Sequence, residues 1–312
     1  MRDGWAARML SPAAWVVARA TARRVARPGW RAPVPVLCCG NAGVGGAGKT
    51  TVVLDLAARL VARGVAVHCL SRGYGGRLRG PVRVDARVHA AEDVGDEPLL
   101  LAAVAPTWVG ADRVLSAQAA IRAGAEALLM DDGLQNPGLV QDAALLVIDG
   151  AAGFGNGRVM PAGPLREPAV VAARRCRAAV MIGIDGRGAR AALPAGMAVL
   201  EAWLVPDQTL HGRRVVAFAG IARPDKFHAT LAQAGATVVE TMDFPDHHRF
   251  RQRELRAVIA KAAGLQAIAV TTPKDAVRLT PAWRARVRTV GVRLEWRDEA
   301  AVEALLTEVC GM

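Results

Sequence analysis

The sequence predicts an α/β fold: a P-loop NTPase-like domain on a parallel sheet, followed by a second, smaller α/β domain. Two observations support it. Short apolar runs at 34–39, 125–130 and 143–148 are typical of buried parallel strands. A glycine-rich loop joins the first of these runs to a helical pattern at 50–60. At about 150 residues per domain, the chain makes one large domain or two smaller ones.

The order of these patterns divides the chain into three parts. A basic, amphipathic N-terminal segment is expected at 1–35 and a P-loop domain at 36–211. The smaller C-terminal α/β domain is expected at 212–312, where the strand-like run 215–220 begins it. Right-handed crossovers between parallel strands place the site at the carboxyl ends of the strands.

Composition excludes several classes of protein. The chain of 312 residues is 52% hydrophobic and 22% charged, which is too apolar for disorder. Five cysteines without a C-x-x-C pair favour packed, reduced thiols over a disulfide framework. No apolar run reaches the roughly 18 residues of a spanning helix, and no signal-peptide pattern is present. The net charge of +12 indicates an anionic partner or surface.

The N-terminal segment carries half of that charge. Seven arginines face one acid, Asp3, before residue 32: Arg2, Arg8, Arg19, Arg23, Arg24, Arg27 and Arg31. Ser11-Pro12 predicts a helix start and Pro28-Gly29 its end. The later arginines share one arc, opposite Trp15 and several alanines. Such a helix lies in an anionic bilayer interface, or it packs its alanines on the core as an ordinary surface helix. The segment alone favours neither.

Residues 43–50 fit the pattern G-x-x-x-x-G-K-[ST] in full. The glycines let backbone N–H groups surround a β-phosphate, and the helix N-terminus adds partial positive charge. Lys49, one of four lysines in the chain, would reach the β- and γ-phosphates, and Thr50 would ligate Mg²⁺. The strand–loop–helix context makes this a strong prediction of a nucleotide-phosphate site.

Acidic and histidine residues follow other elements. Asp131-Asp132 ends the run 125–130, where a carboxylate can hold Mg²⁺ or its waters. Asp149 ends the run 143–148 in the same way, or it caps a turn. Asp96-Glu97 is a carboxylate base near the γ-phosphate, or a favourable helix start. Residues 243–248 place two histidines among acids. A histidine paired with a carboxylate there could accept a proton, or the segment is a plain polar loop. The segment is a poor match for a zinc site.

Two further segments bear on specificity. The Gly/Pro-rich stretch 153–168 has the length and composition of a substrate-binding loop. The sequence TTPKD at 271–275 only superficially matches the guanine-reading motif of GTPases, because its lysine and aspartate are adjacent.

Taken together, these segments resemble one family, the tetraacyldisaccharide 4′-kinases, which are the lipid A kinases of Gram-negative bacteria. The matching segments run from residue 40 to about 280: GNAGVGGAGKT, SRGYGG, VGDEP, DDGLQN, GNGRVMPAGPLREP, FAGIARPDKF, FPDHHRF and TTPKDAVRL. VGDEP, DDGLQN and PAGPLREP are specific to that family. The chain departs from it at Ala47, where threonine is usual, and at Thr51, where proline is usual.

The resemblance implies transfer of the γ-phosphoryl group of ATP, with Mg²⁺, to the 4′-hydroxyl of tetraacyldisaccharide 1-phosphate. It implies a nucleotide-binding stretch made of Val44, Gly45, Gly46, Ala47, Gly48, Lys49, Thr50 and Thr51. The implied metal residues are Thr50, Asp131 and Glu167, and the implied catalytic residues are Lys49, Asp96, Asp132 and His247. Asp96 over Glu97 and His247 over His248 are preferences that stay open.

A lipid substrate that remains in the bilayer favours membrane docking of the N-terminal helix. The expected setting is the cytoplasmic face of the bacterial inner membrane, with no nucleic acid and no obligate protein partner. Two alternatives remain. A P-loop ATPase or GTPase switch explains the loop and the paired acids. It assigns no function to the basic N-terminal helix or to the segment Asp246-His247-His248. A cytosolic small-molecule kinase requires the N-terminal helix to pack on the core.

Overall fold

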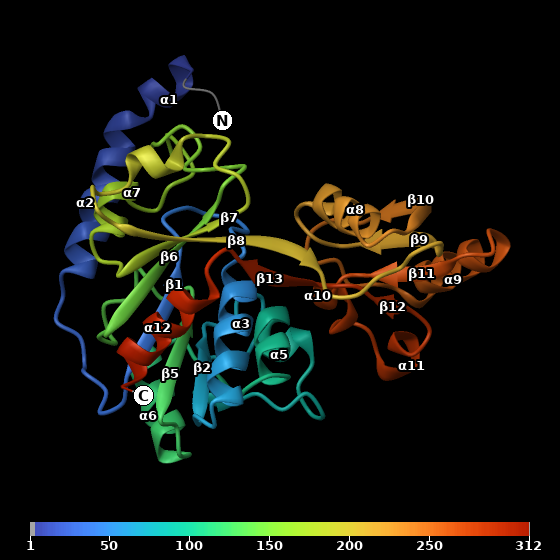
Figure 1. Cartoon of the computed structure of the whole chain (residues 1–312), viewed down its shortest axis with the longest axis horizontal. Coiled ribbons are helices and arrows are strands. Elements are labelled where there is room, and N and C mark those ends of the chain that lie inside the picture. Colours follow the sequence, from blue (N-terminus) through green and yellow to red (C-terminus); the bar gives the residue numbers. More distant parts are fainter. Residues whose placement is uncertain (1–3, 312) are drawn as a thin grey trace.

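The computed structural model describes residues 4–311, so Met312 and the first three residues of the predicted N-terminal segment, including Arg2 and Asp3, lie outside it. In the described part, the strands form two sheets (Figure 1). The larger sheet has nine strands in the order β13-β8-β7-β6-β1-β5-β2-β4-β3. The smaller has four, in the order β10-β9-β11-β12. This confirms the predicted α/β class with a large parallel sheet.

The strands of the larger sheet run mostly parallel, and β3 and β13 are antiparallel to their neighbours at its two edges. Their bounds are β1 Val36–Gly40, β2 Val67–Ser71, β3 Val82–Arg83, β4 Thr107–Val109, β5 Ala127–Asp131, β6 Ala143–Asp149, β7 Ala178–Ile182, β8 Ala198–Pro206 and β13 Val292–Trp296. The smaller, fully parallel sheet contains β9 Arg214–Ala219, β10 Thr237–Asp243, β11 Ile268–Thr271 and β12 Arg288–Thr289.

Helices cover the larger sheet on both faces, so alternate residues of its strands enter two separate cores. Leu37 and Cys39 pack with α3 (Lys49–Ala62) and α12 (Glu299–Cys310). Val36 and Cys38 face α2 (Ser11–Val25), α6 (Arg113–Arg122) and α7 (Ala169–Ala173). Burial on both faces explains why these strands are continuously apolar in sequence. The remaining helices are α1 Trp5–Met9, α4 Ala91–Val94, α5 Asp96–Ala102, η1 Ala189–Ala192, α8 Pro224–Gln233, α9 Gln252–Gly264, α10 Pro273–Ala276 and α11 Pro281–Arg284.

The chain crosses twice between the two sheets. Strand β8 extends from the larger sheet toward the smaller one, and β13 returns antiparallel along it (Figure 1). After β13, helix α12 buries Val302 and Leu306 in the core of the larger sheet. The division into domains at 36–211 and 212–312 stays a proposal. The strand order indicates that the second domain ends before β13, so that residues 292–310 belong with the first domain. We call residues 207–291 the second lobe and the rest the first lobe.

The buried face of helix α2 differs from the predicted apolar face, because Trp15, Ala22 and Ala26 are exposed and only Ala18 and Val25 of that face are partly buried. Ala14 and Thr21 are buried, and Val17 and Ala18 pack against the core of the first lobe. Trp15 nevertheless stays 64% exposed, close to the exposed Met9 and Leu10. Within residues 4–311, no helix is both long and apolar enough to cross a membrane. The five cysteines are free thiols, as predicted, and burial raises the pKa of Cys69 to about 12.

Candidate active site

The glycine-rich loop lies where β1 ends and α3 begins, at the carboxyl edge of the larger sheet. Gly48 forms the N-cap of α3 with φ 88°, a left-handed conformation that glycine adopts without strain. A Cβ at Gly48 would also lie 2.6 Å from Cδ1 of Ile182. Lys49, Thr50 and Thr51 follow in the first turn, whose free N–H groups favour an anion. The predicted nucleotide-binding residues 44–51 thus form one continuous loop and helix start.

Three contacts hold this loop in place. The Nζ atom of Lys49 lies 3.2 Å from Oδ1 of Asn41 and 3.8 Å from Oδ2 of Asp132. The N–H of Val44 donates to the carbonyl of Pro164, at 2.9 Å. The predicted substrate loop 153–168 is therefore anchored directly on the phosphate-binding loop.

Asp131 ends β5, next to β1, and is 3% exposed. The Thr50 hydroxyl donates to Oδ2 of Asp131 at 3.3 Å, while the buried Oδ1 of Asp131 has no hydrogen-bond partner. Burial and the nearby charges of Glu97 and Asp132 raise the pKa of Asp131 to about 7, despite the opposing charges of Lys49 and Lys274. A buried carboxylate with an unpaired oxygen beside a threonine hydroxyl fits a divalent cation.

Among residues 4–311, no three histidine, cysteine, aspartate or glutamate side chains gather as a metal cage. Mg²⁺ is usually bound by one or two protein ligands together with substrate phosphates, so such a cage is not required here. Thr50 and Asp131 are the residues whose oxygen atoms fit Mg²⁺. The predicted metal site at these two positions stays a prediction.

Asp132 and Glu167, the other predicted acids, each bind an arginine. Arg166 donates to both carboxylate oxygens of Asp132, at 2.9 and 3.0 Å. Glu167 is 2% exposed, and Arg175 donates to both its oxygens, at 2.7 and 2.8 Å. Gln135 donates to Glu167 as well, at 2.9 Å. These contacts disfavour Glu167 as a metal ligand, because a guanidinium occupies both oxygens. That role stays a prediction.

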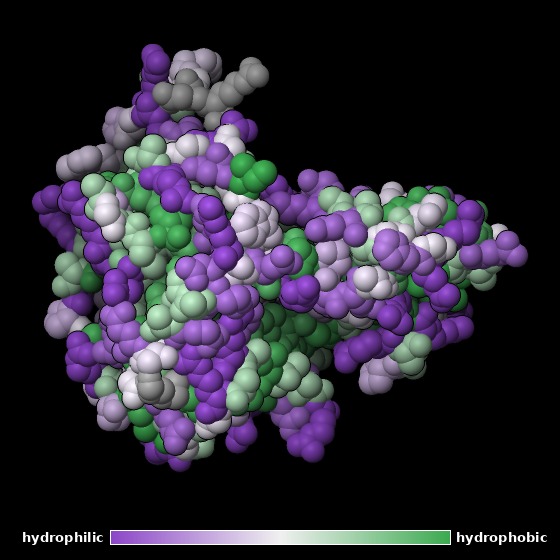
Figure 2. Space-filling view, in the orientation of Figure 1, coloured by the Kyte–Doolittle hydropathy of each residue, from purple (hydrophilic) through white to green (hydrophobic). Residues whose placement is uncertain are grey.

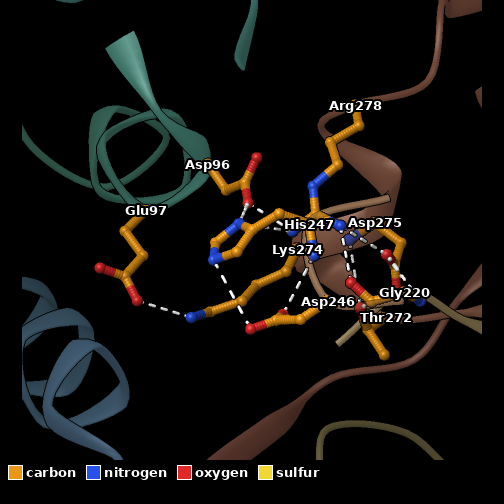
Figure 3. A network of polar contacts seen from close by, with 9 residues as sticks. All are labelled: Asp96, Glu97, Gly220, Asp246, His247, Thr272, Lys274, Asp275 and Arg278. Atoms are coloured by element: carbon orange, nitrogen blue, oxygen red, sulfur yellow. Dashed lines mark hydrogen bonds and ion pairs between the residues drawn. The ribbon is translucent and has the colours of Figure 1, made fainter. Parts of the chain in front are cut away.

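Asp96 and His247 meet across the two lobes (Figure 3). Asp96 lies in the first turn of α5 and is 7% exposed, whereas His247 lies in the loop after β10. Nδ1 of His247 is 2.9 Å from Oδ2 of Asp96. Because a carboxylate only accepts, this contact requires a proton on Nδ1 and leaves Nε2 of the neutral ring as an acceptor. Asp96 and His247, which the resemblance implied to be catalytic, are therefore in hydrogen-bonding geometry.

The adjacent residues Glu97 and His248 have different partners. The carboxylate of Glu97 accepts from Lys274 of the second lobe, at 2.6 Å. Nε2 of His248 lies 2.9 Å from Glu254, and its ring stacks on Phe244 with centroids 4.8 Å apart. His248 is thus held within its own lobe, and the geometry favours His247 as the partner of Asp96.

The sequence did not predict three residues that lie around this pair as part of the site. Lys274 and Arg278 of the second lobe reach Glu97 and Asp96, and Tyr74 is 75% exposed with its ring 6.1 Å from that of His247. Each belongs to a segment that supported the family resemblance, and Lys274 is one of four lysines. The space-filling view is hollowed between the two lobes, and both hydrophilic and hydrophobic residues line the hollow (Figure 2).

Comparison with known proteins bears on the whole chain. The sequence profile of the family described as "Tetraacyldisaccharide-1-P 4′-kinase" matches residues 6–310. A protein of Gluconacetobacter diazotrophicus named tetraacyldisaccharide 4′-kinase is 60% identical over 97% of this chain and 94% of its own length. One of the same name from Rhodospirillum centenum is 53% identical over 96% of this chain and 90% of its own.

A solved structure has the same architecture. The crystal structure of LpxK from Aquifex aeolicus in complex with ATP superposes with a TM-score of 0.79, at 25% identity. The match covers 97% of this chain and 99% of the other. The profile match, the close relatives and this shared fold agree with the site geometry: the chain belongs to the tetraacyldisaccharide-1-P 4′-kinase family.

Proposed function

We propose that this protein is a kinase of lipid A biosynthesis that transfers the γ-phosphoryl group of ATP to the 4′-hydroxyl of tetraacyldisaccharide 1-phosphate. One observation carries the proposal: the phosphate-binding loop and the Asp96–His247 pair occur in one chain of this family, with the pair 2.9 Å apart across the lobes. The names of the relatives and the ATP in the Aquifex structure support the acceptor and the donor.

The phosphate-binding loop serves the donor. Its backbone N–H groups and the start of α3 hold the β- and γ-phosphates, and Lys49 neutralises charge on the oxygens during transfer. Thr50 and Asp131 would hold Mg²⁺. When bound, that ion offsets negative charge on the phosphates and orients them. Asp132, held by Arg166 and 3.8 Å from Lys49, would keep the lysine near the phosphates.

The Asp96–His247 pair serves the acceptor. A sugar hydroxyl is too weak an acid to ionise unaided near neutral pH. Nε2 of His247 accepts the hydroxyl proton as the oxygen bonds to the γ-phosphorus. The bond to the β-γ bridging oxygen breaks, and ADP leaves with its electron pair. Asp96 keeps the proton on Nδ1 and stabilises the imidazolium that forms.

The N-terminal helices would bring the enzyme to its lipid substrate at an anionic membrane surface, the cytoplasmic face of the inner membrane. They lie along the outer margin of the first lobe (Figure 1). Large apolar side chains remain exposed there beside arginines: Trp5, Met9, Leu10, Trp15 and Val16. Exposed tryptophans and arginines on one short helix pair suit an interface of lipid phosphates and acyl chains.

The proposal is tested by measuring transfer of labelled γ-phosphate from ATP to tetraacyldisaccharide 1-phosphate in detergent micelles. The expected result is labelled lipid with the wild type and its loss in Lys49→Ala and Asp96→Ala. Turnover of ATP without labelled lipid would refute the proposed acceptor and favour a nucleotide switch or another substrate.

A further inference from the structure

Arg278 is buried between the two lobes, and the mechanism above does not use it. It follows α10 in the second lobe, and its side chain is 6% exposed. One terminal nitrogen, Nη1, donates to Oδ1 of Asp275 at 2.9 Å and to the carbonyl of Gly220 at 2.8 Å. The other, Nη2, donates to Oδ2 of Asp96 in the first lobe. The guanidinium therefore spans the lobe boundary (Figure 3).

Two of the three acceptors that bind Arg278 also bind His247. Oδ2 of Asp96 accepts from Nδ1 of the ring, at 2.9 Å. The carbonyl of Gly220 accepts from the backbone N–H of His247, at 3.0 Å. Arg278 thus fixes the group that orients the imidazole and the group that anchors the main chain below it. Nη2 and Nδ1 lie 3.3 Å apart because both donate to the same oxygen.

His247 needs such support because its backbone is strained. Its φ is 58°, in the left-handed region that residues other than glycine rarely adopt. Such a conformation persists where surrounding contacts determine it. Gly220, directly after β9, is crowded by the same loop, since a Cβ there would lie 3.0 Å from Cβ of His248.

Arg278 is itself held rigidly. Asp275 is fully buried, and its carboxylate accepts from the Thr272 hydroxyl at 2.7 Å and from the N–H of Gly220 at 3.1 Å. A planar guanidinium can bind Asp96, Asp275 and a carbonyl together in one geometry, which a lysine ammonium cannot reproduce. Burial alone would raise the pKa of Asp96, but the hydrogen bonds and charges of Arg278 and His247 outweigh it, so the pKa is lowered.

We infer that Arg278 is a positioning residue for phosphoryl transfer: it sets the orientation of His247 by binding Asp96 and the Gly220 carbonyl at once. The inference rests on the proposed function. It assigns Arg278 no contact with the substrate, so its effect passes through the imidazole.

The first experiment compares Arg278→Met and Arg278→Lys with wild type in the lipid-labelling assay. A misplaced base costs up to about 100-fold, so Arg278→Met should lower kcat by about that factor. The KM values for ATP and lipid should change by less than about threefold, because ground-state binding is untouched. Arg278→Lys retains the charge without the bridging geometry and should lose about tenfold. A kcat of Arg278→Met within threefold of wild type would overturn the inference.

Arg284→Met is the matched control for a merely structural effect. Arg284 also lies in the second lobe, where its guanidinium donates to the carbonyls of Ala276 and Leu279, at 3.0 and 3.2 Å. Its loss should lower the thermal midpoint without lowering kcat below half of wild type. Equal losses of kcat in the Arg278 and Arg284 variants would make Arg278 an ordinary structural residue.

A double-mutant cycle with His247→Ala separates the remaining explanations. If Arg278 acts through the imidazole, adding Arg278→Lys to His247→Ala should lower the residual kcat by less than twofold. Multiplicative losses would refute the inference. Arg278→Lys serves here because it keeps the buried charge and so folds even if Arg278→Met does not. ¹⁵N spectra of the His247 ring give a readout without activity: the hydrogen-bonded Nδ1–H signal should weaken in Arg278→Lys.

Failure of the inference differs from failure of the proposed function. If the acceptor is wrong, the wild type itself labels no lipid. If only the inference is wrong, wild type labels lipid, His247→Ala labels it only at its low residual rate, and the Arg278 variants behave like the control.

Discussion

Nδ1 of His247 lies 2.9 Å from Oδ2 of Asp96, although 151 positions separate them in the chain. One residue belongs to the first lobe and the other to the second. The pair is therefore complete only while the lobes are together. In the proposed mechanism the second lobe supplies the general base and the first lobe the phosphate-binding loop, so lobe separation would expose ATP without a base beside it.

Asp96→Asn should lower kcat for lipid phosphorylation by about 10²–10⁴-fold. An amide can donate to Nδ1 and so favours the tautomer that places the proton on Nε2. Glu97→Gln is the matched control, because Glu97 binds Lys274 instead of His247. It should lose less than tenfold in the same labelling assay. A larger loss in Glu97→Gln than in Asp96→Asn would reverse the assignment.

His247→Ala and His248→Ala should have opposite signatures. The His247 side chain is 48% exposed at the lobe boundary, so its removal should abolish most activity with little change in thermal midpoint. His248 stacks on Phe244 and binds Glu254, so its removal should lower the midpoint by several degrees. Melting curves and kcat measured on the same samples test both. Stable, inactive His248→Ala would contradict this division.

The pH dependence of stability should reveal Asp131 in metal-free protein. Its pKa is raised from 3.8 to about 7, chiefly by burial. The folded state then binds more protons than the unfolded state within that interval, so the free energy of unfolding falls as pH rises through it. Asp131→Asn carries no such proton. At pH 8 without Mg²⁺ it should be more stable than wild type, while losing Mg²⁺-dependent stabilisation by nucleotide. Urea unfolding at pH 5 and pH 8 measures the pH dependence of stability. Unfolding with nucleotide, in the presence and absence of Mg²⁺, measures the Mg²⁺-dependent stabilisation.

Glu167→Gln should destabilise the protein, because it leaves Arg175 without its carboxylate. We expect a loss of about 1–3 kcal/mol in the free energy of unfolding. Arg175→Met should cost a similar amount, and the double variant should cost less than the sum. If Glu167→Gln instead kept full stability and raised the Mg²⁺ concentration needed for activity, the carboxylate would be a metal ligand.

The N-terminal helices should control membrane binding. Deleting residues 1–31, or reversing Arg19, Arg23 and Arg24 to glutamate, should release the protein from vesicles that contain anionic lipid. Trp15→Ser should weaken binding even at high salt, because it removes apolar contact and leaves the charge unchanged. Vesicle co-sedimentation measures all three, with neutral vesicles as the control. Unchanged binding of the deletion variant would exclude this segment as the docking element.

Local patterns in the sequence predicted the parts of this protein that local physics determines. The strand predicted at 34–39 and found at 36–40, the glycine-rich loop and the helix after it were predicted, since a parallel strand is continuously apolar and phosphate binding needs glycines beside Lys49. The class of fold and the paired acids at the end of β5 were predicted in the same way. These features involve residues within a few positions of one another, so spacing alone records them.

The family resemblance implied that Asp96 and His247 act together, but the other contacts between the lobes were decided by the tertiary structure alone. Nothing in the spacing of Asp96, His247 and Arg278 indicates that they share hydrogen-bond partners, because each lies in a different segment. Likewise, the return of β13 and α12 to the larger sheet depends on the antiparallel pairing with β8. Sequence patterns record which residues are apolar or flexible nearby. Which distant side chain neutralises a buried charge depends on how the lobes pack, and that packing places Arg278 on Asp96.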